Sequence, residues 1–314
     1  MNKSFTLIEI LVVIVIIGIL SAFIIVSMAG VSEKANIAKG QAFSNSLKNA
    51  LLLGLTSEWK LNGPTAAGSP ATVDDIKDSW TTNNGVLCTA GGIFPHPTPT
   101  VRSGADCVSG NCLEFDNIDD QYYVNNPNLR YIGAGMTLEA WIKINPSASN
   151  EAYIFSKPWN SNGYYNYRFH YSNDVLYFYL GGDTGQTKTI SASNIQKNKW
   201  YNVAATVDSG KLMKIFVNGA VVASDTHAIT TWIPSAGGGD QNLALSIGHM
   251  YRCDQSVPAQ IFHGHMDELR YFSEAVPASR VKENYYSGLN KLLANSGIEN
   301  QEYGLRINEL MAQN

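Results

Sequence analysis

The sequence predicts an α+β protein with a long N-terminal helix, an antiparallel β-sandwich and a short helical tail. Residues 10–29 form an apolar run of twenty residues without a charged side chain. Residues 112–272 hold many short segments of strand-like alternation, separated by turn signals such as Asn218-Gly219. Residues 279–314 return to apolar spacings typical of amphipathic helices. Helical and strand-like patterns therefore occupy separate stretches, as in an α+β chain.

The apolar run has the length of a membrane-spanning helix. Twenty residues at about 1.5 Å rise match a hydrocarbon core of roughly 30 Å. Beyond it, apolar residues continue at spacings of three to five as far as Leu55, and no proline interrupts them. We therefore expect one helix over residues 5–55, of which residues 5–30 cross the membrane. Glu9 lies just inside this helix, where an unpaired carboxylate costs about 2.5–3.5 kcal/mol in lipid.

The segment that contains Glu9 resembles the processing signal of type IV prepilins and pseudopilins. The resemblance is carried by KSFTLIE at residues 3–9 and by the apolar run that follows. It implies that a prepilin peptidase removes residues 1–4, that Phe5 is N-methylated, and that Glu9 acts in assembly. Ser4 stands where the family usually has glycine. A secretory signal peptide cleaved near residues 27–29 is the alternative.

Assembly would explain the carboxylate in the apolar helix. After cleavage, the new amine of Phe5 on a neighbouring subunit would give Glu9 a charge-assisted partner, whereas unpaired burial would be costly. The expected partners are therefore other pilin subunits, the prepilin peptidase and the membrane. We expect a single-pass membrane precursor with its head outside the cytoplasm, and a cell-surface filament after assembly.

Composition favours a β-rich domain outside the cytoplasm. Charged residues make up 15% of the chain, which also has 16 tyrosines and 27 glycines. The net charge of −4 and the lack of a basic stripe give no reason to expect a nucleic-acid partner. Four cysteines allow three disulfide pairings. One of the three joins Cys107 to Cys112 across a short turn and leaves Cys88 for Cys253.

The strand-rich region resembles concanavalin A-like, laminin-G-like jelly rolls. The resemblance implies a β-sandwich over residues 56–278. The apolar spacing of residues 279–314 predicts a helical tail after it. The motifs that carry it are CLEFD at 112–116, DQYYV at 120–124, TLEAWI at 137–142, WYNVA at 200–204, IFVNG at 215–219, IG at 247–248 and FHGHMDELRY at 262–271.

The same resemblance implies a structural calcium ion, held by Asp78 and Asp267. Calcium prefers carboxylate and carbonyl oxygens from turns, and Asp78 precedes a turn-rich stretch. The competing explanation is that these aspartates cap loops or face water.

Aromatic and planar polar side chains predict a ligand-binding face. They concentrate on two strands and one loop, and comprise Trp159, Tyr164, Tyr165, Tyr167, Arg168, His170, Tyr177 and Tyr179. Alternation places Tyr165, Tyr167, Phe169 and Tyr171 on one strand face. It places Tyr164, Arg168 and His170 on the other, where with Trp159 they are the candidate ligand contacts. The competing explanation is aromatic packing within the sheet.

We expect no enzymatic activity. The related glycoside hydrolases carry a strand of the type Glu-x-Asp-x-Glu, which this sequence lacks. Asp267 and Glu268 are adjacent, so a regular strand would point them to opposite faces.

The sequence therefore predicts a type IV pilin-like filament subunit, a minor one, with a lectin-like head for adhesion or recognition of a glycan or surface protein. Two alternatives remain: a structural subunit whose head only coats the filament, and a membrane-anchored binding protein that does not polymerise.

Overall fold

The structure is a computed structural model of the chain. It describes residues 8, 11–17, 54–87, 98–118, 120, 122–148, 151–158, 165–183, 185–232, 244–250 and 260–312. Its contacts divide the chain into two units, Met1–Leu53 and Gly54–Asn314. In the first unit, residues 8 and 11–17 are helical. Ser4, Phe5 and Glu9 lie outside the described residues.

The helix predicted over residues 5–55 does not include Gly54 or Leu55. Gly54 lies in a turn, with φ of +83°. Leu55 then starts strand β1 (Leu55–Trp59). Within the described part of the chain, no helix is both long enough and apolar enough to cross a bilayer.

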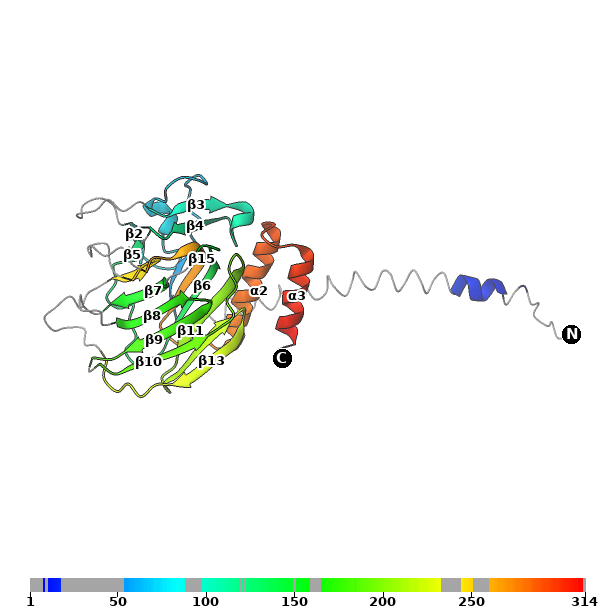
Figure 1. Cartoon of the computed structure of the whole chain (residues 1–314). Helices are drawn as coiled ribbons and strands as arrows, with labels where there is room; N and C mark the ends of the chain where they lie inside the picture. The colour runs from blue at the N-terminus through cyan, green and yellow to red at the C-terminus, as the bar shows by residue number, and fades with distance from the viewer. Residues whose placement is uncertain are drawn as a thin grey trace. The chain divides into compact units, whose positions relative to one another are not determined.

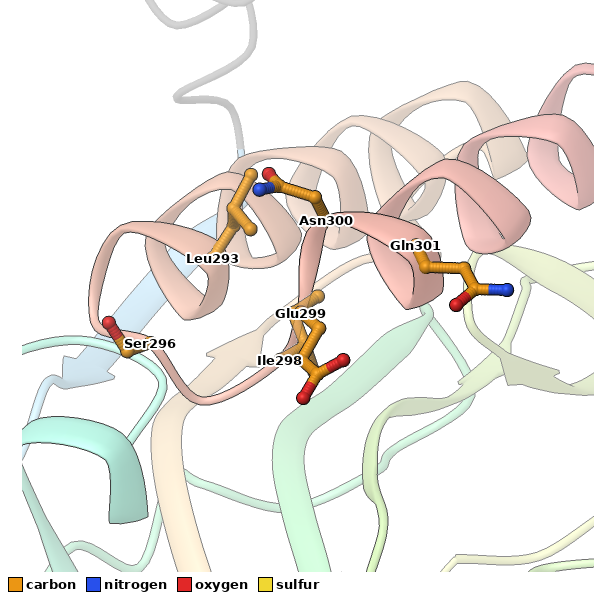
Figure 2. Close-up of a pocket in the computed structure, with 6 residues that line it drawn as sticks. All are labelled: Leu293, Ser296, Ile298, Glu299, Asn300 and Gln301. Atoms are coloured by element: carbon orange, nitrogen blue, oxygen red, sulfur yellow. The ribbon is translucent and has the colours of Figure 1, made fainter.

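The second unit is built from two antiparallel sheets (Figure 1). In sheet A the strands follow the order β13-β12-β11-β6-β15-β4-β3, and β1 pairs with β15. These strands are β3 (Thr100–Ser103), β4 (Asn111–Asp116), β6 (Met136–Ile144), β11 (Trp200–Val207), β12 (Leu212–Val217), β13 (Ala220–Thr226) and β15 (His263–Phe272).

Sheet B has the order β10-β9-β8-β7-β14-β5-β2. Its strands are β2 (Gly85–Leu87), β5 (Tyr122–Val124), β7 (Ala152–Pro158), β8 (Tyr165–Ser172), β9 (Val175–Gly181), β10 (Thr187–Ala192) and β14 (Leu245–Ile247). Short 3-10 helices occupy Val73–Ile76 and Gly104–Asp106. The predicted antiparallel sandwich is confirmed.

The main core lies between the two sheets, where alternate residues of each strand point inward. Leu138 and Ile142 of β6 belong to it, and Phe169 of β8 meets Phe178 of β9 edge to face with ring centroids 6.2 Å apart. Burial of these side chains is the main source of stability for the sandwich, at about 25 cal/mol for each Å² of apolar area removed from water.

The predicted helical tail forms α2 (Ala278–Ala294) and α3 (Asn300–Met311), which lie beside sheet A (Figure 1). A second apolar cluster joins them to the outward residues of that sheet. Its centre is Trp141 of β6, whose ring stacks on Tyr285 of α2 with centroids 5.7 Å apart. Because the tail covers Trp141 while Ile142 points into the sandwich, β6 is buried on both faces.

A bulge in β15 changes the predicted orientation of its acidic pair. The register of β15 against β6 shifts between Asp267 and Arg270, and Glu268 has φ of +50°. The Glu268 carboxylate accepts a hydrogen bond from Lys291 of α2 at 2.6 Å. Asp267 accepts one from the backbone of Val108, which belongs to the same tail-side cluster. Both carboxylates therefore lie on the face of sheet A that α2 and α3 cover, so the prediction that they point to opposite faces is wrong.

Buried charges beneath α2 are paired. The Arg270 guanidinium lies 2.9 Å from Glu58, 2.5 Å from Glu268 and 3.7 Å from Glu139. Burial raises the pKa of Glu139, which also accepts a hydrogen bond from Asn284 of α2 at 2.6 Å. Removing one partner from such a network is strongly destabilising, since it leaves a buried charge without compensation. The network therefore fixes where α2 lies on the sheet.

Gly288 of α2 allows the helix to approach Trp141. A Cβ atom at this glycine would lie 2.5 Å from the indole ring. We expect Gly288→Val to lower the free energy of unfolding by about 1–3 kcal/mol through overpacking. Urea unfolding followed by tryptophan fluorescence measures this change.

Gly304 of α3 provides the matched control. A Cβ atom there would meet no heavy atom of the described residues within 4 Å. Gly304→Ala should therefore raise helix stability by up to about 1 kcal/mol. Equal stability of the Gly288→Val variant and the unmodified chain would contradict the docking of α2 on Trp141.

Candidate functional site

The outer face of sheet B carries two rows of polar and aromatic side chains. Cross-strand partners in an antiparallel sheet share a face. From β10 to β14 the first row is Thr189, Tyr179, Arg168, Ser156 and Ser246.

The second row crosses β10, β9, β8 and β7. Its residues are Ser191, Tyr177, His170 and Tyr153. Neighbouring residues Tyr167, Phe169 and Phe178 belong to the sandwich core. The two rows therefore lie on the side of the sheet that faces away from the core.

Arg168 lies at the centre of the first row. Its guanidinium carbon is 4.4 Å from the ring centroid of Tyr179 and 5.2 Å from that of Tyr165. One guanidinium nitrogen, Nη1, donates a hydrogen bond to the Tyr153 hydroxyl at 3.3 Å. Among the described residues, no ion pair includes Arg168, and its Nε is buried without a hydrogen-bond partner. Two aromatic rings thus hold the cation by cation–π contacts.

The position of Tyr165 differs from the alternation that the sequence predicts. Tyr165 was expected on the face of Tyr167, but its ring contacts Arg168 and Tyr179. The reason is a register shift between β7 and β8 that leaves Asn166 unpaired. The Asn166 side chain instead bonds the backbone N–H and carbonyl of Tyr131, at 2.7 and 2.9 Å. A bulge of this kind redirects the residue beside it.

His170 lies between two tyrosine rings. Its ring centroid is 5.0 Å from Tyr153 and 5.1 Å from Tyr177, with an interplanar angle of 13° in both pairs. The side chain is 5% exposed. Burial and the charge of Arg168 lower the pKa of His170 to about 3, so the ring is neutral at physiological pH. Its Nδ1 has no hydrogen-bond partner in the part of the chain that the structure describes.

The structure brings together Arg168 and His170, two of the predicted ligand contacts. The other two, Trp159 and Tyr164, lie outside the described residues. Sequence reasoning missed Tyr153 and the hydroxyl residues on neighbouring strands, because their strands were not aligned with β8. Register, which the sequence does not contain, was the missing information.

Asp78 does not present its carboxylate to a cation. Its Oδ1 accepts hydrogen bonds from the backbone N–H groups of Glu58, Trp80 and Thr81 at 2.8–3.1 Å. Its Oδ2 accepts the Thr81 hydroxyl at 2.6 Å. Burial alone would raise the pKa of Asp78, but these bonds lower it below its usual value. The carboxylate therefore caps a turn.

The Asp267 carboxylate on β15 also accepts backbone N–H groups, although burial and the charge of Glu268 raise its pKa, in contrast to that of Asp78. Its Oδ2 accepts the backbone N–H groups of Val108 and Ser109, both at 2.9 Å, and its Oδ1 accepts that of Glu268 at 2.7 Å. N–H donors occupy the directions from which an ion would be bound, so this predicted pair does not fit a calcium site. The described residues also contain no group of three His, Cys, Asp or Glu side chains placed for a metal.

The loop that holds Asp267 is closed by a disulfide. Cys107 and Cys112 are bonded with an S–S distance of 2.03 Å, one of the pairings that the sequence left open. Cys88 and Cys253 lie outside the described residues.

Two family models match the chain. One, described as the concanavalin A-like lectin/glucanases superfamily, matches residues 116–282. The other, described as the prokaryotic N-terminal methylation motif, matches residues 1–25. The matched segments agree with the two resemblances in the sequence.

Solved structures of similar fold include three binding domains. The botulinum neurotoxin serotype D binding domain is 16% identical over 75% of this chain, with a TM-score of 0.52. The serotype D ligand binding domain in complex with N-acetylneuraminic acid is 14% identical over 75%, with a TM-score of 0.53. The binding domain of Paraclostridial Mosquitocidal Protein 1 is 15% identical over 76%, with a TM-score of 0.52. The chain spans about half of each, 51–53% of their length, and the likeness concerns the fold.

Chelation tests the calcium ion that the resemblance implies. An ion bound through Asp78 and Asp267 would raise the unfolding temperature Tm by mass action. Since N–H donors occupy both carboxylates, we expect the same Tm in excess calcium and in EDTA, measured by calorimetry. A higher Tm in calcium that disappears in Asp78→Asn would show that this assignment of donors is wrong.

Proposed function

The chain belongs to the concanavalin A-like lectin/glucanase superfamily and carries a prokaryotic N-terminal methylation motif, and from this premise we propose that it is a minor type IV pilin-like subunit with a glycan-binding head. The observation that carries the proposal is the joining of the two parts in one chain. In this proposal the N-terminal motif mediates assembly into the filament, and the outer face of sheet B binds the glycan.

The N-terminal part supports the assembly step. The matched motif at residues 1–25 includes Ser4, Phe5 and Glu9. In the proposal, a prepilin peptidase cleaves after Ser4, and the Glu9 carboxylate pairs with the Phe5 amine of the next subunit. The precursor is a single-pass membrane protein with its head outside the cytoplasm, and the filament that contains it lies at the cell surface.

The outer face of sheet B supports the recognition step. The half-buried rings of Tyr177 and Tyr179 and the exposed hydroxyls of Thr189 and Ser191 lie side by side on it, while His170 and Tyr153 are buried beneath. Such a surface offers flat apolar contacts and hydrogen-bonding groups to a sugar ring. Similar structures are receptor or ligand binding domains, one of them solved with N-acetylneuraminic acid. A surface protein is the second class of ligand in this proposal.

Two alternative functions require different parts of the chain. A head that only coats the filament would need the assembly motif and no ligand. An anchored binding protein that does not polymerise would need the ligand and no role for Glu9. No enzymatic activity forms part of the proposal.

Replacing Glu9 tests assembly. We expect Glu9→Ala to abolish incorporation into sheared surface filaments, because the Phe5 amine of the neighbouring subunit loses its charged partner. Immunoblotting of the sheared and membrane fractions measures this, and cleavage after Ser4 should persist. The adjacent change Ile8→Val serves as the control. Normal incorporation of the Glu9→Ala chain would favour the anchored, non-polymerising protein.

A glycan array probed with the full 314-residue chain in detergent tests recognition. We expect binding that Tyr177→Ala weakens by about tenfold or more, as truncation of a central contact residue commonly does. Tyr177→Phe keeps the ring and should retain most of the binding. An array without any bound glycan would favour the head as a filament coat.

A further inference from the structure

The positive charge of Arg168 distinguishes it from most arginines in the head. Four arginines have a glutamate oxygen within 2.5–3.2 Å, and these are Arg102, Arg270, Arg280 and Arg306. Arg168 has two tyrosine rings and one tyrosine hydroxyl instead. Among the described residues, it has no ion-pair partner. A guanidinium cannot lose its proton near neutral pH, so this charge is permanent.

Among the described residues, the neighbours of Arg168 do not neutralise its charge. His170 is the next outward residue on β8, and its ring is neutral for the reason given above. The nearest carboxylate in the hydrogen-bond chain is that of Glu151, which accepts the Tyr153 hydroxyl at 3.2 Å. Tyr153 therefore stands between the two charges. The cation keeps an unsatisfied attraction for an anion, which partial burial makes stronger than it would be in water.

The contacts that hold Arg168 also keep its donors in place. The rings of Tyr165 and Tyr179 lie against the guanidinium, and cation–π contacts use the faces of the rings without consuming N–H groups. Its Nε is buried and has no partner in the described structure, so an incoming anion meets the outer guanidinium nitrogens first. A planar guanidinium held in this way suits a planar carboxylate, which it can bind through two parallel hydrogen bonds.

The side chains around this cation suit a sugar. The exposed hydroxyls of Thr189 and Ser191 on β10 follow Tyr179 and Tyr177 in the two rows. The Ser156 hydroxyl is buried and donates to the backbone carbonyls of His249 and Met250. Polar hydroxyls and aromatic rings therefore flank a cation that has no anionic partner in the part of the chain that the structure describes.

We propose that the outer face of sheet B binds carboxylate-bearing saccharides, and that Arg168 binds the carboxylate. This inference rests on the proposed glycan-binding function and narrows it to acidic sugars. Aromatic rings on β8 and β9 contact the sugar ring, and the neighbouring hydroxyls contact its hydroxyl groups.

Matched glycans that differ only in charge provide the test. The probes are glycans that contain glucuronic, galacturonic or N-acetylneuraminic acid, each as the free acid and as its methyl ester. The full chain in detergent is titrated with each pair at low and at physiological salt. We expect at least one free acid to bind about tenfold or more tightly than its ester, with a preference that falls as salt rises.

Variants assign the preference to Arg168. Arg168→Met keeps much of the side-chain stem and should bring the acid and the ester to equal affinity. Arg168→Lys keeps the charge without the planar fork and should retain only part of the preference. Arg102→Met makes the same charge change on sheet A, where Arg102 pairs with Glu114, and should leave the preference intact. Urea unfolding shows whether each variant folds.

Each outcome decides a different question. Equal or tighter binding of the esters would overturn the acidic-sugar inference and leave glycan binding in place. Binding of no glycan in either form would overturn both. An acid preference that survives in Arg168→Met would overturn the role of Arg168. If Arg168→Met does not fold, the comparison of acids with esters in the unmodified chain and in Arg168→Lys decides.

Discussion

The central strands of sheet A are covered on both faces, by sheet B on one side and by the helical tail on the other, and this double burial governs the chemistry of their side chains. The apolar side chains of β6 pack on both sides of the sheet: Ile142 lies in the sandwich core and Trp141 lies beneath α2. Polar side chains that share the covered face need partners, because unpaired charges there would be costly. Arg270 satisfies this need by joining glutamates from β1, β6 and β15.

The sequence predicted the strands of residues 112–272 and the helices of residues 279–314, but not the positions at which strand alternation is interrupted. Strand alternation correctly placed Tyr167, Phe169 and Tyr171 in the core. It failed for Tyr165 and Glu268, because one extra residue in a bulge changes the face of its neighbour. Such insertions depend on pairing with a distant strand. The donors around Asp78 and Asp267 also come from other segments, so the sequence showed an acidic side chain but not its environment.

The two sheets have different outer faces. That of sheet A is closed by α2, α3 and the disulfide loop at Cys107–Cys112, whose backbone holds Asp267. That of sheet B carries the rows of Arg168 and His170. Sequence reasoning found these two residues because aromatic and cationic side chains were dense on β8. It did not find Tyr153, whose place beside His170 depends on the register of β7.

Strand β1 follows directly on the N-terminal unit, at Gly54, and it is hydrogen-bonded to β15 from Leu55 to Trp59. On its other side, β15 pairs with β6. Mechanical tension that arrives along the N-terminal segment is therefore transmitted first to the middle of the sheet, and not to a peripheral hairpin such as β12–β13. Many hydrogen bonds share the force at that point, so the attachment of β1 resists extension of the chain.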